Sequence, residues 1–137
     1  MKAALKMITS VGAGKGYGGQ HSQSLESLFT HLPGIWVVYP SNPYDMKGLM
    51  TACIREDNPT VMVKHKRLLG ASSLVPEEPY VVPLGKAAII RPGNDVTVVA
   101  YGRMAMEALS AADLLAVEGI DCEVIDVRSL VPLDTRT

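Results

Sequence analysis

The chain has 137 residues, the length of one ordinary domain, and 47% of them are hydrophobic while 20% are charged. This composition is typical of a globular protein with a buried core and excludes a disordered chain. A net charge of −1, from 13 basic and 14 acidic residues, gives no electrostatic reason to expect nucleic acid or an anionic membrane as partner. The longest apolar runs, such as 96–100, are strand-sized, so no transmembrane helix is predicted.

Two cysteines, Cys53 and Cys122, lie far apart, without CxxC spacing or a neighbouring pair of histidines. We therefore expect two buried thiols in a reducing compartment, and neither a zinc site nor a disulfide framework. Residues 10–20 supply glycines and polar side chains where a signal peptide needs an apolar stretch. No targeting segment is predicted, and a cytoplasmic protein of bacterial type is expected.

In chain order, the first half alternates strands with helices. A strand at 6–9 leads into a loop at 11–19, because five glycines in nine residues make regular structure costly. The pattern then predicts helix 24–31, strand 35–39, helix 44–56 and strand 60–63. Asn42 is the predicted N-cap of the second helix, with Pro43 at its first position.

Residues 67–85 form a predicted linker, because Pro76, Pro79 and Pro83 suit neither a helix nor a central strand. The second half then predicts strand 86–91, a turn, strand 96–100, helix 104–118 and strand 122–127. The stretch 130–134 is expected to leave the last strand. Strands that alternate with helices predict parallel α/β sheets. Neither sheet is complete, so open strand edges and self-association are expected.

One histidine stands out as a candidate for chemistry. His21 follows the glycine loop and is predicted to open a helix, where free backbone N–H groups suit proton transfer or an anionic partner. The alternative is a surface histidine beside a helix that Ser22 or Ser24 caps. The loop glycines lack the GxGxxG spacing of a dinucleotide site.

The other titratable residues have plainer explanations. His31 suits the C-terminal end of its helix, and His65 lies in a basic run predicted to be a solvated loop that could hold an acidic group. No Ser–His–Asp arrangement is readable, because the candidate acids fit a first helical turn, a solvent face and a strand end: Asp45, Asp113 and Asp126.

Several motifs follow one another in the order found in the beta subunits of 2-oxo acid dehydrogenases. They include Gln20-His21-Ser22-Gln23, and together they cover essentially all of the chain: 18–24, 31–35, 40–49, 57–59, 82–87, 93–102 and 126–134. The chain therefore resembles this thiamine-diphosphate-dependent, transketolase-like family. Other transketolase-like enzymes are disfavoured, because Gln20-His21-Ser22-Gln23 is the form of the motif found in the dehydrogenases.

The resemblance implies an α/β fold with parallel sheets. Residues 1–66 would be the later half of the pyrimidine-binding domain, 67–85 the linker, and 86–137 the first half of the transketolase C-terminal domain. The implied activity is oxidative decarboxylation of a 2-oxo acid with acyl transfer to lipoamide, and the fragment alone is expected to be inactive. Acetoin dehydrogenase, another transketolase-like thiamine diphosphate enzyme, and a non-catalytic α/β interaction module remain alternatives.

The resemblance also implies cofactors and partners. Thiamine diphosphate would be shared with an alpha subunit in an α2β2 assembly, magnesium would be held through that alpha subunit, and a lipoyl domain or acyltransferase core would be a further partner. His21 matches the family's active-site histidine, which implies proton transfer and electrostatic help during acyl transfer. The family's activating glutamate would lie upstream of Met1, so no cofactor-binding residue is assigned. Ile8 and Lys64 stand where the family often has Arg and Glu.

Some members of the family hold a potassium ion through backbone carbonyls near the end of the second helix. The matching positions, with a plain helix C-terminus as the alternative, are Cys53, Ile54, Glu56 and Asn58.

Overall fold

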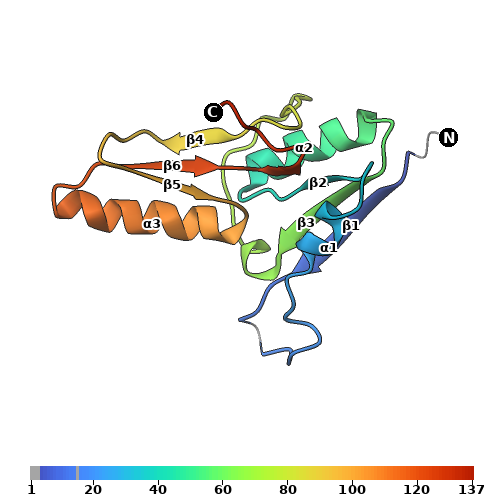
Figure 1. Cartoon of the computed structure of the whole chain (residues 1–137), viewed down its shortest axis with the longest axis horizontal. Helices are drawn as coiled ribbons and strands as arrows, with labels where there is room; N and C mark the ends of the chain where they lie inside the picture. Colours follow the sequence, from blue (N-terminus) through green and yellow to red (C-terminus); the bar gives the residue numbers. More distant parts are fainter. Residues whose placement is uncertain (1–3, 15) are drawn as a thin grey trace.

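The computed structural model describes residues 4–14 and 16–137. Figure 1 shows two sheets side by side, with α3 along the smaller one. The elements in chain order are β1 (Lys6–Val11), α1 (Glu26–Thr30), β2 (Trp36–Val38), α2 (Pro43–Arg55), β3 (Thr60–His65), the 3₁₀ helix η1 (Lys66–Leu68), β4 (Ala88–Arg91), β5 (Val96–Ala100), α3 (Arg103–Val117), β6 (Cys122–Asp126) and β7 (Ser129–Val131). Across the described ranges, no helix is long and apolar enough to cross a membrane.

The larger sheet has the strand order β1-β3-β2-β7, and its first three strands are parallel. Successive side chains of a strand point to opposite faces of the sheet. Successive residues of β2 and of β3 are buried, so both faces of these strands are covered. Val37 and Val61 face the side that Phe29 of α1 covers, whereas Val38 and Met62 face Leu49 of α2. Burial on two faces explains why these strands are continuous apolar runs.

The start of α2 is as predicted. Asn42 is its N-cap and accepts a hydrogen bond from the backbone N–H of Asp45 at 2.9 Å, and Pro43 occupies the first turn. This bond satisfies one of the N–H groups that a helix leaves free at its N-terminus.

The smaller sheet has the order β4-β6-β5, and α3 covers one of its faces. Ala112 of α3 packs on Cys122 and Val124 of β6, and all three are fully buried. Cys53 and Cys122 are both free and buried, as predicted. Ile89 and Val99 remain 52% and 63% exposed.

The prediction of parallel pairing is wrong for two strand pairs. The chain reverses after β4, and β6 inserts between β4 and β5, so β6 is parallel to β5 and antiparallel to β4. The segment expected to leave the last strand instead forms β7, which pairs antiparallel with β2. The second half of the chain thereby adds a strand to the sheet of the first half.

Arg128 joins the two halves just before β7. Its backbone has a positive φ of 56°, which places its carbonyl to accept a hydrogen bond from the N–H of Tyr39 at 2.7 Å. Its guanidinium pairs with Asp45 at 3.0 Å and donates to the carbonyls of Lys86 and Ala87 at 3.1 and 2.9 Å. Because this cation and Asp45 are both largely buried, the fork holds α2 against the start of the smaller sheet.

The linker lies across α2. Residues 69–87 contain no helix or strand, yet the N–H of Val82 donates to the carbonyl of Gly48 at 3.2 Å. The ring of Tyr80 stacks on that of Tyr44, with centroids 4.5 Å apart. The ammonium of Lys47 donates to three successive linker carbonyls, beginning at Pro76. The positions of the domain boundaries stay a prediction.

Candidate functional site

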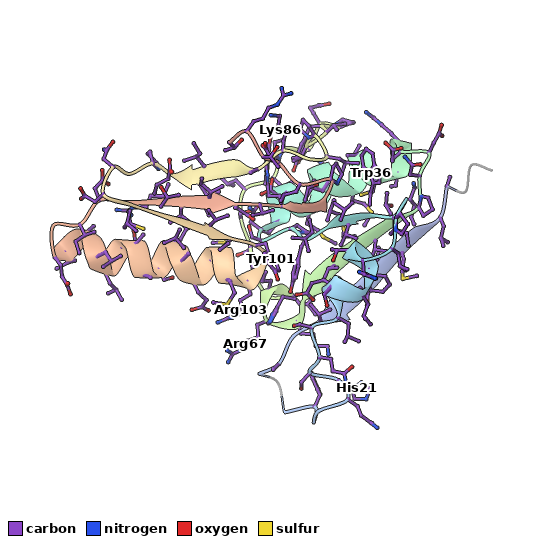
Figure 2. The ribbon with its side chains drawn as sticks, in the orientation of Figure 1. His21, Trp36, Arg67, Lys86, Tyr101 and Arg103 are labelled. Atoms are coloured by element: carbon purple, nitrogen blue, oxygen red, sulfur yellow. The ribbon has the colours of Figure 1, made fainter. Side chains whose placement is uncertain are left out.

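The candidate site is the glycine loop between β1 and α1. Its conformation requires glycine, because Gly12, Gly14, Gly16 and Gly18 have φ values of 94°, 96°, 74° and 69°. These values lie in the left-handed region, which other residues adopt only with strain. In Figure 2, the loop carries His21 away from the body of the molecule.

The end of β3 and the first residues of η1 form a platform for this loop. A Cβ added to Gly12 would lie 2.0 Å from Nε2 of His65, and one added to Gly14 would lie 2.7 Å from Nε of Arg67. The backbone of the loop thus rests directly on two side chains of the basic run. His65 is therefore part of a packed contact, which corrects the prediction of a solvated loop.

His65 itself is fixed in a defined state. Its Nδ1 accepts a hydrogen bond from the backbone N–H of Arg67 at 3.1 Å, so that nitrogen carries no proton. Burial lowers the pKa of His65 below its usual value, and the positive charges of Arg103 and Arg67 lower it further. The imidazole is consequently neutral at physiological pH, and it supports the loop without adding charge.

Hydrogen bonds hold the part of the loop that carries His21. The hydroxyl of Ser22 donates to the carbonyl of Gly18 at 2.6 Å, and the N–H of Gly12 donates to the carbonyl of Gln23 at 3.0 Å. Lys66, in the platform, donates from Nζ to the carbonyl of His21. The Lys66 ammonium also lies 5.7 Å from the centre of the Tyr17 ring. One lysine therefore contacts the loop at two places.

A cavity of about 190 Å³ lies beside His21, between the loop, β1 and α1. Its polar lining includes Gln20, Gln23 and Lys66, and its apolar lining includes Leu28 and Phe29. The side chain of His21 is exposed at the rim. An exposed imidazole at the mouth of a partly apolar cavity can reach a group bound there, as proton transfer requires.

The prediction that His21 opens a helix is wrong. α1 begins only at Glu26, its N-cap is Leu25, and no side chain caps it, so neither Ser22 nor Ser24 has the expected role. The hydroxyl of Ser22 instead bonds within the loop. His31 lies at the C-cap of α1, as predicted.

A cluster of polar side chains lies where the loop region meets the second half of the chain, with Tyr39 buried and Tyr101 exposed. The ring centroids of Tyr39 and Tyr101 are 5.4 Å apart. A Cβ added to Gly102 would lie 2.4 Å from the Tyr39 ring, so this position requires glycine. Oε2 of Glu26 is buried without a hydrogen-bond partner among the described residues. Burial raises the pKa of Tyr39, and the Glu26 carboxylate raises it further. Figure 2 shows Tyr101, Arg103 and Arg67 gathered in this region.

The acids of the sequence analysis lie where they were expected. Asp45 is in the first turn of α2, Asp113 is exposed on α3 and pairs with Arg91 at 2.5 Å, and Asp126 ends β6. Asp126 is fully buried and accepts a hydrogen bond from the hydroxyl of Ser41. Burial raises its pKa to about 6. No histidine of the described residues completes this pair into a catalytic triad.

The carbonyls after α2 do not fit a potassium ion. The N–H of Glu56 occupies the Cys53 carbonyl at 3.2 Å. The Lys6 ammonium donates to the carbonyls of Glu56 at 2.5 Å and of Asn58 at 2.9 Å. The fourth predicted ligand is the carbonyl of Ile54, a residue whose side chain is exposed. Three of the four carbonyls thus have partners from the chain itself.

The chain does not by itself fit thiamine diphosphate. The cavity beside His21 has no carboxylate among its described lining residues, although the family activates the cofactor with one. In the part of the chain that the structure describes, no group of His, Cys, Asp or Glu side chains is arranged to hold a metal ion. A diphosphate held through magnesium would therefore need ligands other than the described residues of this chain.

Sequence reasoning missed the functional residues that act through distant contacts. Lys66 and Arg67 were noted only as part of a basic run, and Lys6 and Arg128 were not singled out. Their partners lie 45, 50 and 83 positions away for Lys66, Lys6 and Arg128. The only local signal that could have pointed to them is the run of loop glycines, because glycine allows another group to approach the backbone closely.

Comparison with known proteins identifies the family. Residues 1–72 match the family described as transketolase, pyrimidine binding domain, and residues 85–137 match the one described as transketolase, C-terminal domain. The fold is similar to a solved structure, a split gene transketolase described as an inactive beta4 tetramer. The TM-score is 0.78 at 27% sequence identity, over 97% of this chain and 42% of that one.

Curated relatives are beta subunits of larger enzymes. The chain is 51% identical to the acetoin:2,6-dichlorophenolindophenol oxidoreductase subunit beta of Cupriavidus necator, over 93% of this chain and 38% of that protein. It is 47% identical to the 2-oxoisovalerate dehydrogenase subunit beta of Pseudomonas aeruginosa, over 88% of this chain and 39% of the relative. It is 45% identical to the pyruvate dehydrogenase E1 component subunit beta-4, chloroplastic, of Oryza sativa subsp. japonica, over 92% of this chain and 32% of that protein.

The chain thus spans well under half the length of these curated relatives. Its match to two successive domains and its identity to several beta subunits confirm the resemblance that the motifs indicated. The chain belongs to the transketolase family, as a stretch of a pyrimidine-binding domain followed by a stretch of a C-terminal domain of the kind found in 2-oxo acid dehydrogenase beta subunits.

Proposed function

We propose that this chain is part of the beta subunit of a thiamine-diphosphate-dependent oxidoreductase that decarboxylates a 2-oxo acid and passes the acyl group to lipoamide. The observation that carries the proposal is His21, exposed at the rim of a cavity on a loop whose backbone is hydrogen-bonded to Lys66 of the platform. A proton-transfer group works best when its position is fixed and its ring stays free, and this loop supplies both.

The role of His21 is to hold and move a proton at its ring while the acyl group leaves for its acceptor. Its backbone carbonyl is bonded to Lys66, so the constraint lies on the main chain and leaves the imidazole available. The Lys66 ammonium lines the same cavity and supplies positive charge beside it. An anionic group that enters the cavity would meet this charge, which lowers the cost of negative charge developing there.

The cofactor and the partners follow from the family and from what this chain lacks. We include thiamine diphosphate as the cofactor, with magnesium and the diphosphate held by an alpha subunit, because no carboxylate lines the cavity among the described residues. An α2β2 assembly, a lipoyl domain as acyl acceptor and a cytoplasmic location belong to the same proposal. The named relatives support the alpha subunit as a partner, since each relative is a beta subunit.

The test is His21→Ala in the complete protein. We expect transfer to lipoamide to fall ~10²–10⁴-fold, the usual contribution of a general acid–base group, with a smaller effect on decarboxylation. Whole-complex turnover measures the first rate, and an assay with an artificial electron acceptor measures the second. Pyruvate, a branched-chain 2-oxo acid and acetoin are compared as substrates, so that the same assay identifies the substrate.

His31→Ala is the matched control. His31 is also exposed and lies at the other end of α1, outside the cavity. This variant should leave both rates unchanged. A small and equal loss of both rates in His21→Ala would reduce His21 to a structural residue and refute the proposed role.

A further inference from the structure

A lysine side chain lies among backbone carbonyls at the C-terminal end of α2. The Lys6 ammonium, from the first residue of β1, donates to the carbonyls of Glu56 at 2.5 Å and of Asn58 at 2.9 Å. These two carbonyls are called the cradle below. Lys6 is 50 and 52 positions away from them in the chain, so only the fold brings the three residues together.

The turn after α2 is built to present these carbonyls. Oε1 of the Glu56 side chain accepts from the N–H of Asp57 at 3.0 Å, from the N–H of Asn58 at 3.2 Å and from Nδ2 of Asn58 at 2.8 Å. The Glu56 side chain thereby satisfies the donors of the turn, while the backbone carbonyls of Glu56 and Asn58 are left for a cation. A helix C-terminus also carries partial negative charge, which favours a cation at this place.

The strand register delivers Lys6 to the cradle. β1 pairs with β3 in parallel, with Lys6 opposite Thr60, and the N–H of Thr60 donates to the carbonyl of Leu5 at 2.9 Å. Thr60 follows the turn directly, so the first residue of β1 necessarily lies beside the turn. On β1, Lys6 shares a face with Ile8, which is opposite Met62, and Met62 packs against α2. The side chain therefore points toward α2 and reaches its end.

An ammonium and a potassium ion are alternatives at such a place. Both carry one positive charge and both bind carbonyl oxygens, which replace the hydration shell of the ion. A tethered ammonium loses little translational freedom on binding, whereas a free ion must be taken from solution. Two cations on the same two carbonyls would repel each other at short range.

We propose that the Lys6 ammonium is a built-in cation at the cradle of Glu56 and Asn58, and that it makes this protein independent of potassium there. Some members of the resembled family hold a potassium ion at the matching carbonyls, whereas here a residue of the chain donates to them. The inference concerns stability of the turn between α2 and β3. It does not rest on the role of His21.

The experiment compares thermal unfolding of the complete protein in potassium chloride and in choline chloride at equal ionic strength. In the wild type, we expect the same unfolding midpoint in both salts. In Lys6→Met, which keeps an apolar chain of similar length, the midpoint should fall in choline chloride. Potassium chloride should then restore it in a saturable way, because the vacated cradle binds the free ion.

Lys47→Met is the matched control, because Lys47 also donates to backbone carbonyls, those of Pro76, Glu77 and Glu78. Its loss of stability should be the same in both salts. An equal potassium response in Lys47→Met, or no potassium response in a folded Lys6→Met, overturns the proposal.

A second measurement needs no variant. Thallium(I), a substitute for potassium that scatters X-rays anomalously, is soaked into crystals of the wild-type protein. We expect no thallium at the carbonyls of Glu56 and Asn58. Thallium bound there in the wild type overturns the proposal, even where Lys6→Met fails to fold.

Discussion

Gly48 lies in the middle of α2, at the point where the linker crosses the helix. A Cβ added there would be 2.4 Å from Cγ2 of Val82, 2.8 Å from Cε2 of Tyr80 and 3.0 Å from the backbone nitrogen of Val82. Gly48→Ala would therefore push the linker away from α2. It would also weaken the hydrogen bond from the Val82 N–H to the Gly48 carbonyl, now 3.2 Å long.

The size of the effect follows from three contributions. Alanine in a helix interior is favoured over glycine by about 1 kcal/mol, which acts to stabilise the variant. Overpacking costs about 1–3 kcal/mol, and a lost hydrogen bond costs about 1 kcal/mol more. We therefore expect Gly48→Ala to lower the free energy of unfolding by roughly 1–3 kcal/mol, the reverse of what helix propensity alone predicts.

Denaturant unfolding followed by circular dichroism measures this difference, with Gly70→Ala as the matched control. No atom lies within 4 Å of a Cβ at Gly70, and its φ is outside the strained positive range. The control should be neutral or gain about 0.4–1 kcal/mol through the unfolded chain. If Gly48→Ala stabilises the protein as much as Gly70→Ala, then the linker does not lie on α2 and the reasoning is refuted.

Three further predictions concern pH, the loop platform and the isolated chain. The pKa of Asp126 is raised from 3.8 to about 6 by burial, so its stabilising contribution is present below pH 4 and is lost as pH rises through about 6. In the wild type, this loss of unfolding free energy amounts to about 3 kcal/mol between acid and neutral pH, as measured by denaturant unfolding. In Asp126→Asn the pH-dependent loss should be absent, and a variant with the same pH profile as the wild type contradicts the assignment. Lys66→Met should speed hydrogen exchange of loop amides 16–25, and it should lower the rate of acyl transfer less than His21→Ala does. Lys66→Arg should restore both the exchange rates and the acyl-transfer rate. Equal exchange in the wild type, Lys66→Met and Lys66→Arg would show that Lys66 does not anchor the loop. The isolated chain should bind no thiamine diphosphate with magnesium in a calorimetric titration and should self-associate in light scattering, because apolar side chains such as Ile89 and Val99 are exposed; sub-micromolar cofactor binding or a monodisperse monomer would contradict these two expectations.

Elements that depend on neighbouring residues could be predicted from the sequence. Asn42 and Pro43 start α2 because capping is a contact within one turn, and Gly119 ends α3 with a φ of 83° because only a few residues decide a helix end. The apolar runs of β2 and β3 predicted buried strands for the same reason. The short α1 is the exception: its apolar spacing predicted helix 24–31, but no side chain caps it and it forms only from Glu26 to Thr30.

The candidate site was predicted in part. The order of motifs identified His21 as the active-site match, and the glycines indicated a loop, because both are properties of consecutive residues. The platform of His65, Lys66 and Arg67 was not predicted. Its contacts cross from β3 to a loop more than 40 residues earlier, and hydrophobic periodicity carries no information about which loop a basic run will meet.

By itself, the sequence determined the family, the alternation of strands and helices and the histidine that carries the proposed chemistry. Only the tertiary structure decided that β7 joins the first sheet, that Arg128 binds Asp45, and that Lys6 reaches the cradle. The position of Lys6 depends on strand register, where a shift of one residue turns every side chain to the other face, and the other two depend on how distant segments pack together. Register is set by the packing of the whole sheet against its helices, and so it exists only once the chain has folded.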